Sequence, residues 1–392
     1  MIFRTKLLLD RIVGTPAMLL MNVVVYLVGK IIRRDHSINE SNIRIIAIQK
    51  IVGMGSIIEF SPCLRAIKRT YPKASIIFVS SLSNRELLSM YRDYIDDFVF
   101  IDDKTFLKLL ISSFRAILKL IAKKIDLFLN LEVYSSFSTF ISISSLARNR
   151  FGFYIRSATF RKALDTHHIF YNQHKNIREI YSNMIKAAGC KSFDKDDLIK
   201  FNISENIIQK VNKYLSQNNI NKYILININA SELSLERRWP ESKWIKLIKL
   251  LIDKTGHEIL LPGSANERDY IQKEIVNKIE KEYLKYIFNI AGQLTIEEFV
   301  YIIRQCLLFI TVDSGPYHLG VSEDINMISL WGPENPFLYG MSKHNQSFIY
   351  KHLYCSPCIK QTDSPPCKGS NICMKNIKVD EVMENVMNLL RN

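Results

Sequence analysis

The fold of the second half of the chain is decided by residues 311–320, which read TVDSGPYHLG. An apolar run at 307–310 predicts a buried parallel strand before them, and Pro316 suits the first position of a helix. A strand that ends in Asp-Ser-Gly and turns into a helix points backbone N–H groups and a hydroxyl at one spot, which attracts phosphate. Asp313 is placed for a sugar hydroxyl or a cation. The alternative is that Asp313 or Ser314 only caps the helix.

The loop after the first strand of this half is also polar. A strand predicted at 223–228 is followed by Ser231 and then by Arg237 and Arg238. Two arginines at the carboxyl end of a strand can form charge-assisted, bidentate hydrogen bonds with phosphate oxygens. A pair of arginines that is only solvated is the alternative.

Two further predicted strands of this half end in glycine. The strand at 258–261 leads to Gly263 and then to Glu267, a carboxylate placed to accept hydrogen bonds from both hydroxyls of a ribose. The strand and turn at 288–292 end in Gly292. Because the carboxyl ends of parallel strands share one edge of a sheet, we expect these loops to converge with the Asp-Ser-Gly turn on a nucleotide site.

The first half predicts another doubly wound α/β domain, because short apolar strands alternate with helical stretches. The turn at 53–56 reads GMGS, which lacks the third glycine and the acid of a dinucleotide fingerprint. Glu59 lies three residues after Ser56, so both side chains project from one face of the next helix. Glu59 is a candidate general base, and a helix N-terminal acid is the alternative. The strands of this half are predicted at 43–48, 75–80, 98–101 and 127–131.

Residues 167–190 predict a long helix that ends at Gly189. The lysine-rich stretch 191–200 that follows predicts the crossing between the two domains. The last apolar periodicity, at 379–390, predicts a C-terminal helix.

The N-terminal segment at 12–29 is almost entirely apolar and has basic residues on both sides. As a helix it would be about 27 Å long, slightly short of the roughly 30 Å hydrocarbon core of a bilayer. We therefore expect a helix that is embedded in, or lies on, the inner face of a membrane. A single membrane span and a buried core helix are the alternatives.

The chain of 392 residues is long enough for two domains, and its net charge of +15 calls for an anionic partner. An acidic membrane and a phosphorylated substrate fit this charge. The basic residues are scattered and form no recognisable nucleic-acid module, so we expect no nucleic-acid partner.

Four cysteines crowd near the C-terminus, in a stretch that is rich in Pro, Ser and Lys. Four thiolates that start with a CxxC pair can close a tetrahedral zinc site. The spacing of the second pair is not CxxC, so two disulfides or free thiols are the alternatives. The four are Cys355, Cys358, Cys367 and Cys373.

These residues resemble glycosyltransferase family 9, the group that includes the lipopolysaccharide heptosyltransferases. The resemblance runs from about residue 43 to the C-terminus and rests on short motifs in a fixed order. The motifs are Gly55-Ser56 with Pro62, Arg237-Arg238-Trp239-Pro240, Pro262-Gly263 with Glu267, Ala291-Gly292, Asp313-Ser314-Gly315-Pro316 with His318, and Trp331-Gly332-Pro333 with Tyr339-Gly340.

The resemblance implies the GT-B architecture, in which two Rossmann-like domains face a cleft, here with an N-terminal apolar helix. It implies inverting transfer of a sugar from a nucleotide-sugar donor, ADP-heptose or similar, to lipopolysaccharide or another cell-surface glycan at the cytoplasmic face of the bacterial inner membrane. It also implies catalysis without a cofactor or an essential metal. The predicted divisions are a membrane-associated segment (1–40), an acceptor domain (41–190), a nucleotide-sugar domain (191–352), and a Cys-rich loop with a C-terminal helix that packs back on the first domain (353–392).

By position, the resemblance implies that Glu267 binds the ribose, that Arg237 binds the diphosphate or the sugar, and that Asp313 contacts the sugar. It makes Ser314, Gly315 and His318 the phosphate cradle.

One position departs from the family pattern. Family heptosyltransferases place an Asp, the catalytic base, where this chain has Ser56. A serine hydroxyl cannot deprotonate an acceptor at neutral pH without a base of its own. We therefore predict that Glu59 is the base and that Ser56 orients the acceptor. A homologue that binds a nucleotide sugar or glycan without catalysis is the alternative.

Overall fold

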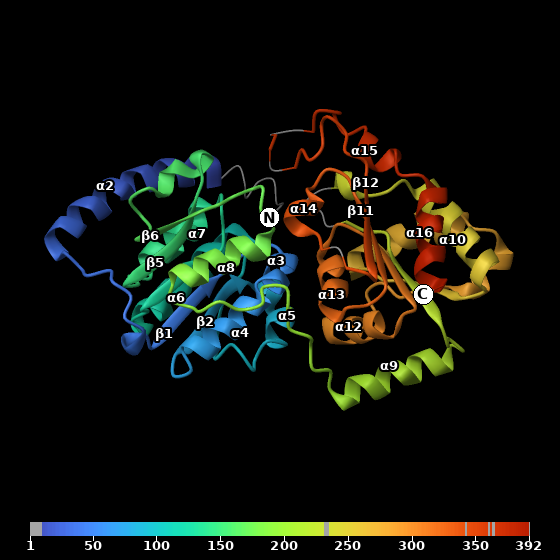
Figure 1. Ribbon diagram of the computed structural model, residues 1–392, viewed down its shortest axis with the longest axis horizontal. Coiled ribbons are helices and arrows are strands. Elements are labelled where there is room, and N and C mark those ends of the chain that lie inside the picture. Colours follow the sequence, from blue (N-terminus) through green and yellow to red (C-terminus); the bar gives the residue numbers. More distant parts are fainter. Residues whose placement is uncertain (1–9, 231–234, 342, 360, 363–364, 392) are drawn as a thin grey trace. The chain divides into compact units, whose positions relative to one another are not determined.

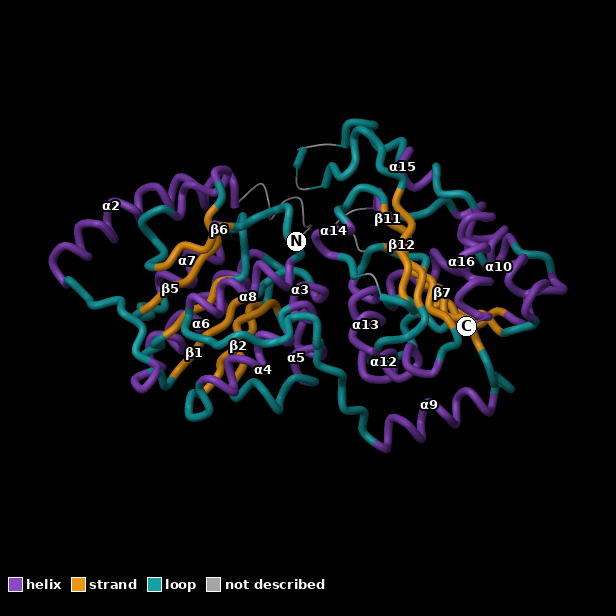
Figure 2. The backbone as a smooth tube through the Cα atoms, in the orientation of Figure 1, coloured by secondary structure: helices purple, strands orange, loops and turns teal. Residues whose placement is uncertain are grey.

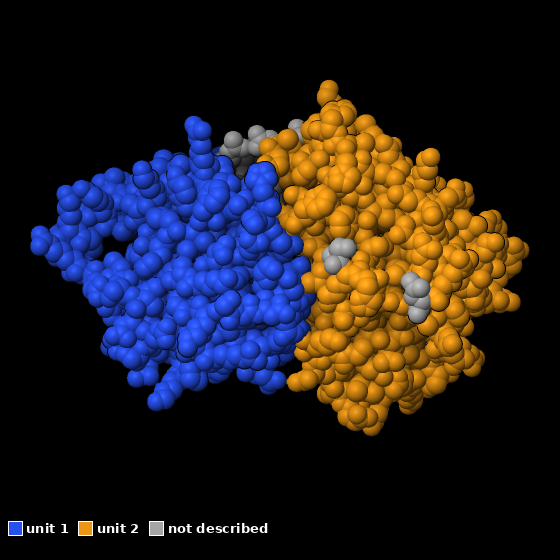
Figure 3. Space-filling view, in the orientation of Figure 1, with its two compact units in different colours: residues 1–199 blue, residues 200–392 orange. Residues whose placement is uncertain are grey.

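The computed structural model describes residues 10–230, 235–341, 343–359, 361–362 and 365–391 (Figure 1). The chain divides into two units, Met1–Ile199 and Lys200–Asn392, which are coloured separately in Figure 3. Each unit has its own parallel sheet with helices around it (Figure 2). The prediction of two doubly wound α/β halves is therefore confirmed.

The sheet of the first unit has the strand order β3-β2-β1-β4-β5-β6, and all of its pairs are parallel. The inner strands are covered by helices on both faces, which is why they read as unbroken apolar runs. The order reverses between β1 and β4, and such a point is where open α/β sheets bind ligands. The strands are β1 (Ile45–Gln49), β2 (Ser75–Ser81), β3 (Asp97–Ile101), β4 (Leu127–Asn130), β5 (Asn149–Tyr154) and β6 (His167–Phe170).

The helical stretch after β1 consists of two separate helices, α3 and α4. A single helix was expected after the first strand, but α3 ends at Glu59 and α4 begins at Ser61, with Pro62 in its first turn. Pro62 has no N–H to continue the hydrogen-bond ladder of the preceding helix. The helical segments are η1 (Asp10–Gly14), α2 (Thr15–Ile32), η2 (Glu40–Asn42), α3 (Met54–Glu59), α4 (Ser61–Thr70), η3 (Leu82–Asn84), α5 (Arg85–Ser89), α6 (Phe106–Lys123), α7 (Ser136–Ser144), η4 (Arg156–Arg161) and α8 (Ile177–Ala187).

The helix predicted over residues 167–190 is wrong in its first part. Residues 167–170 form the edge strand β6, which pairs with β5, and α8 begins only at Ile177. Exposure alternates along β6, as expected for a strand with one covered face. The side chain of Asn176 accepts a hydrogen bond from the N–H of Arg178 and so marks the true start of the helix.

The apolar N-terminal segment forms α2, which is fastened to the rest of the first unit along one side. Met18 is buried against residues of α7 and η4. The side-chain amide of Asn22 donates to the carbonyl of Phe160 (2.6 Å) and accepts from the N–H of Ala163 (2.8 Å). Residues 12–32 are long and apolar enough to cross a membrane, and little of them is buried. Signal sequences pass the same test of length and composition.

The sheet of the second unit has the order β12-β11-β10-β7-β8-β9, again with parallel pairs throughout. Its strands are β7 (Tyr223–Asn227), β8 (Glu258–Leu261), β9 (Ile287–Asn289), β10 (Leu308–Val312), β11 (Met327–Trp331) and β12 (Gln346–Tyr350). Its helical segments are α9 (Glu205–Gln217), η5 (Leu235–Arg237), α10 (Glu241–Thr255), η6 (Ala265–Glu267), α11 (Arg268–Glu274), η7 (Val276–Lys278), η8 (Lys281–Tyr286), α12 (Ile296–Gln305), α13 (Gly315–Glu323), α14 (Pro336–Tyr339), α15 (Ile372–Lys375) and α16 (Val379–Arg391).

The C-terminal helix α16 packs within the second unit, whereas the sequence analysis expected it on the first domain. It contacts α10, β10 and β11. Val379, Val382 and Val386 are buried in the same core as the strands of the second sheet. Their spacing of three and four residues puts all three on one helix face, and that face is fully used by its own unit.

Candidate functional site

The Asp-Ser-Gly turn stands where β10 ends and α13 begins, and its side chains are buried. Ser314 makes no capping hydrogen bond to the start of α13, so the capping alternative does not apply to its side chain. Instead its hydroxyl accepts from Nδ2 of Asn227 (3.0 Å) and donates to the carbonyl of Val312 (3.2 Å). Asn227 also donates to the hydroxyl of Thr311 (3.0 Å). The turn is therefore held from the neighbouring strand β7.

Arg237 brings the loop after β7 to this turn. Its Nε lies 3.3 Å from Oδ2 of Asp313, and its Nη2 lies 3.4 Å from Oε2 of Glu334. Burial lowers the pKa of the Arg237 guanidinium, but the carboxylates of Asp313 and Glu334 outweigh burial and raise this pKa. The guanidinium is thus a permanent, nearly buried cation at the carboxyl edge of the sheet.

Arg238 does not share the carboxylate partners of Arg237. Its guanidinium lies over the ring of Tyr270, 4.3 Å from the ring centre, and this ring belongs to α11. The hydroxyl of Tyr270 donates to Oε1 of Glu241 (2.5 Å). The two arginines that the sequence grouped as one anion site therefore contact different partners.

Glu267 and the two glycines form a tight pair of turns after β8 and β9. Oε2 of Glu267 accepts from the N–H (2.7 Å) and the hydroxyl (2.8 Å) of Ser264, which closes a capping box. The N–H of Gly292 donates to the carbonyl of Gly263 (2.9 Å). Gly292 has φ +72°, and a Cβ there would lie 2.7 Å from Cα of Ala265, so no larger residue fits.

Asn229 is a buried residue that the sequence analysis did not select. Among the residues that the structure describes, neither its amide nitrogen nor its amide oxygen has a hydrogen-bond partner. Its Nδ2 would lie 3.1 Å from a Cβ at Gly263, so the amide stands beside the turn after β8. A buried amide without partners is costly unless a ligand completes it. Ser231, two residues on, lies outside the described residues.

His318 is placed by aromatic packing in the first turns of α13. Its ring contacts Tyr317 edge to face at 5.0 Å, and Tyr317 in turn contacts Trp331 at 5.2 Å. The hydroxyl of Tyr317 accepts from the N–H of Met341 (2.7 Å). His318 itself is buried.

In the first unit, the predicted acceptor turn lies between β1 and α3. Gly53 has φ +95°, a conformation that glycine adopts without strain, and the N–H of Ser56 donates to its carbonyl (3.1 Å). Burial raises the pKa of the Tyr181 phenol, which comes from α8, and the Ser56 side chain lowers this pKa only in part. Tyr181 therefore stays protonated.

Glu59 lies deeper than the sequence analysis expected. Only 1% of its surface is exposed, and its Oε2 lies 3.5 Å from Nε of Arg178, which is also buried. Arg178 pairs with Asp196 as well, at 3.1 Å. The proposed base is thus one end of an interior ion pair.

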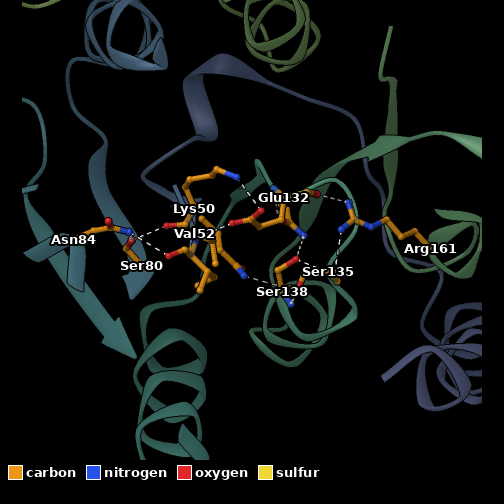
Figure 4. A network of polar contacts seen from close by, with 11 residues as sticks. Lys50, Val52, Ser80, Asn84, Glu132, Ser135, Ser138 and Arg161 are labelled. Atoms are coloured by element: carbon orange, nitrogen blue, oxygen red, sulfur yellow. Dashed lines mark hydrogen bonds and ion pairs between the residues drawn. The ribbon is translucent and has the colours of Figure 1, made fainter. Parts of the chain in front are cut away.

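Another carboxylate, Glu132, follows β4 at the point where the strand order of the first sheet reverses, and Figure 4 shows its contacts. Its Oε1 accepts from the N–H groups of Ile51 and Val52, both at 2.9 Å, and its Oε2 accepts from Nζ of Lys50 at 2.8 Å. Burial raises the pKa of Glu132, but Lys50 and the two N–H groups outweigh burial and hold this pKa below its ordinary value.

The carbonyl groups of the same loop are held from the other side. The hydroxyl of Ser80 donates to the carbonyl of Lys50 (2.6 Å), and Nδ2 of Asn84 donates to the carbonyl of Ile51 (3.1 Å) (Figure 4). The segment 50–52 leads directly into the turn with Ser56. Side chains from two strand ends therefore fix the path of the acceptor turn. The sequence signal was the polar Asn-Leu-Glu after the apolar run at 127–129, which the sequence analysis passed over.

The four C-terminal cysteines form no disulfide among the described residues. Nowhere in the described residues do three His, Cys, Asp or Glu side chains lie close enough together to hold a metal ion. Backbone N–H groups of Asn371 and Gly369 outweigh burial and lower the pKa of Cys367. Burial raises the pKa of Cys373 to about 11. The zinc site therefore rests on the spacing of the cysteines alone.

Two Rossmann-like units on six-stranded parallel sheets, the second with a phosphate-type turn at its carboxyl edge, define a GT-B-like fold. The sequence model of the family described as glycosyltransferase family 9 (heptosyltransferase) matches residues 115–368, and the chain belongs to this family.

Similar proteins agree with this assignment. Lipooligosaccharide heptosyltransferase 2 of Campylobacter jejuni is 24% identical over 344 residues, which cover 86% of this chain and 96% of the relative. The crystal structure of a family 9 glycosyltransferase from Veillonella parvula matches with a TM-score of 0.73 at 19% identity, over 90% of this chain and 99% of that one. The ADP-heptose lipopolysaccharide heptosyltransferase II of E. coli matches with a TM-score of 0.69 at 19% identity, over 89% and 99%.

Proposed function

We propose that this chain moves a heptose or a similar sugar from a nucleotide-sugar donor, ADP-heptose in the first instance, to a lipopolysaccharide or related cell-surface acceptor. Family membership supports glycosyl transfer in lipopolysaccharide biosynthesis. The choice of ADP-heptose is supported by the E. coli neighbour, which is described as an ADP-heptose enzyme. The observation that carries the proposal is the Arg237–Asp313 contact at the carboxyl edge of the second sheet.

The second unit is the proposed donor site. Arg237 would bind diphosphate oxygens, since a guanidinium offers paired N–H donors to phosphate. The N-terminal end of α13, with Ser314, Gly315 and His318, would supply the phosphate cradle. Glu267 would accept from the ribose, using the oxygen that does not cap Ser264. Gly263 and Gly292 would line the same edge, and Arg238 would contribute from its place over Tyr270. Ser231 stays a donor-binding candidate from the sequence.

The proposed reaction inverts the anomeric carbon and uses no metal or cofactor. The acceptor oxygen forms a bond to that carbon while the bond to the diphosphate oxygen breaks, and the electron pair leaves with the nucleoside diphosphate. Arg237 and the start of α13 would stabilise the charge that develops on the leaving group. Asp313 would hold a sugar hydroxyl. The proton of the acceptor hydroxyl passes to a base, for which Glu59 stays the prediction, with Ser56 orienting the acceptor.

A second candidate is a homologue that binds a nucleotide sugar or glycan without transferring it. Two observations in the first unit favour it. Ser56 stands where the family pattern has an Asp, and Glu59 already forms an ion pair with Arg178. An acceptor hydroxyl reaches Glu59 only if that pair opens.

Incubation of the purified chain with ADP-heptose and a heptose-free lipopolysaccharide core tests the two candidates. The proposal expects transfer that persists in a chelator, is abolished by Asp313→Ala, and gives a product with inverted anomeric configuration by NMR. Donor binding without transfer or hydrolysis would establish the second candidate. A thermal-shift comparison of ADP-, GDP- and UDP-sugars identifies the donor base.

We also propose that the protein works at the cytoplasmic face of the inner membrane, held there by α2. The support is the apolar surface that α2 leaves exposed, together with its basic flanks. Carbonate extraction of membranes distinguishes a helix that lies on the membrane surface from a helix that spans the membrane. Release into the supernatant identifies a surface helix, and retention identifies a span.

A further inference from the structure

The helix α6 of the first unit leaves a long apolar stripe uncovered. Its core-facing side chains, Ser113, Ala116 and Leu120, are buried against the sheet. A neighbouring sector of the helix contains only large apolar side chains, each between 37% and 67% exposed. The stripe consists of Leu107, Leu110, Ile111, Phe114, Leu118 and Ile121.

The spacing shows that this is one continuous surface. Positions 107, 110, 111, 114, 118 and 121 repeat at three and four residues, so they lie on one side of the helix over four turns. Soluble proteins rarely expose contiguous apolar patches of this kind, and those that do use them for binding.

The charges along α6 point to the kind of partner. Residues 106–123 contain four basic side chains and no acidic one. Lys108 and Arg115 are exposed on the sector that adjoins the apolar stripe, and Nζ of Lys108 lies 3.9 Å from Oδ2 of Asp102. Lys119 and Lys123 pair with Asp97 at 2.8 and 3.2 Å. An apolar stripe bordered by cations is the pattern of a helix that lies in the headgroup region of an anionic bilayer.

The neighbouring helices also expose apolar side chains. α7 contacts both α6 and α2, and it leaves Phe140 exposed. α2 exposes a series of Leu and Val side chains of its own. α6 and α7 together cover one face of the first sheet. Exposed apolar side chains on three helices that contact in sequence favour a lipid surface as the partner.

We propose that α6 is a second membrane contact, which binds anionic phospholipid through its apolar stripe and its basic border. The choice of partner rests on the proposed membrane location, but the readout is lipid binding and does not depend on sugar transfer.

Quenching by brominated lipid tests the proposal in the full chain. The three native tryptophans, Trp239, Trp244 and Trp331, are buried in the second unit, so a tryptophan introduced at Leu110 reports α6 alone. Leu110→Trp fluorescence should be quenched by brominated phosphatidylglycerol vesicles. The matched variant Leu284→Trp, at an exposed position of the second unit, should not be quenched. Bound protein whose Trp at 110 stays unquenched overturns the proposal, and so does failure to bind these vesicles.

A second variant tests the energetic role of the stripe. Phe114→Glu combined with Leu118→Glu should lower partitioning into phosphatidylglycerol vesicles about tenfold or more, whereas Leu284→Glu should not. Lys108→Gln and Arg115→Gln should each weaken binding about fivefold on anionic vesicles, and little on neutral ones. Unchanged partitioning of the double variant, or a change in oligomeric mass without lipid, overturns the proposal. Transfer to a soluble, lipid-free acceptor should be unaffected, so failure of the enzymatic proposal is seen separately.

Discussion

The Glu59 carboxylate lies 3.5 Å from Nε of Arg178, and the two side chains are 1% and 5% exposed. Removing Glu59 leaves Arg178 paired with Asp196 alone, so the cost should stay below the roughly 3 kcal/mol of a buried charge that loses its partner. We therefore expect Glu59→Gln to lower Tm in thermal denaturation. The general-base hypothesis adds a second effect: kcat should fall by roughly 10² to 10⁴ well below Tm, with donor affinity kept. Near-normal turnover in this variant removes Glu59 as the base.

Arg237 is the second position for a test, because it contacts both Asp313 and Glu334. Arg237→Lys keeps the charge but loses the paired N–H donors. We expect donor affinity to fall about ten- to hundredfold by calorimetry, as for a lost charge-assisted hydrogen bond. Arg238→Lys should have a smaller effect, because Arg238 lies over Tyr270. Equal losses in the two variants would contradict the division of roles between the arginines.

Glu132 offers a test of how the acceptor turn is positioned. Glu132→Gln removes the charge that pairs with Lys50, so we expect a lower Tm, with a loss of about 3 kcal/mol in unfolding free energy. A higher acceptor KM should accompany it, with the donor Kd unchanged. A double-mutant cycle with Lys50→Met isolates the pair, and a coupling energy near zero contradicts it.

The same residue predicts a pH dependence. The folded pKa of Glu132 lies below its unfolded value, so the folded state holds the proton less tightly. The stabilisation by its carboxylate is complete above the unfolded pKa of about 4.3 and is lost as pH falls through the lowered folded value. The Tm difference between wild type and Glu132→Gln should therefore be constant from about pH 7 to 5 and shrink below about pH 4. A difference that grows on acidification is the contrary result.

The cysteine cluster predicts a difference in reactivity. Cys367 is partly exposed and has a lowered thiol pKa, whereas the pKa values of Cys358 and Cys373 are raised. In metal-free protein, iodoacetamide should modify Cys367 first, as mass spectrometry of peptides can show. The zinc hypothesis expects about one Zn per chain in protein purified without chelator, and slower modification until a chelator is added. Metal-free protein with immediate modification would remove the zinc site.

Much of the fold could be predicted from the sequence, because strands covered on both faces appear as unbroken apolar runs. The runs at 75–80 and 258–261 became β2 and β8 with little change. Residues 167–170 were misread, because an edge strand of four residues is too short for its alternation to stand out from a helical pattern. Pairing with β5 decides its structure, and no local signal reports that pairing.

The candidate site was predicted unevenly. The expected convergence of strand-end loops on one sheet edge agrees with the contact of Arg237 and Asp313, which follow the neighbouring strands β7 and β10. It could not show that Arg238 lies over Tyr270, nor that α8 supplies an arginine to Glu59. The importance of Glu132 and Glu334 comes from partners distant in sequence, and that of Asn229 comes from its burial. Exposure of the α6 stripe likewise could not be distinguished from a core-facing side before the packing was known.

The two hydrogen bonds of Asn22 to residues 160 and 163 fasten the middle of α2 to the first unit, and we call this pair of bonds the α2 latch. A protein held at a bilayer through a latched helix searches for its acceptor in two dimensions, with one face always toward the lipid. The relevant acceptor concentration is then a surface density, which tethering raises without any new contact. On the proposed membrane, loosening this latch by Asn22→Ala would lower turnover on vesicle-borne acceptor while leaving the rate on a detergent-dispersed acceptor unchanged.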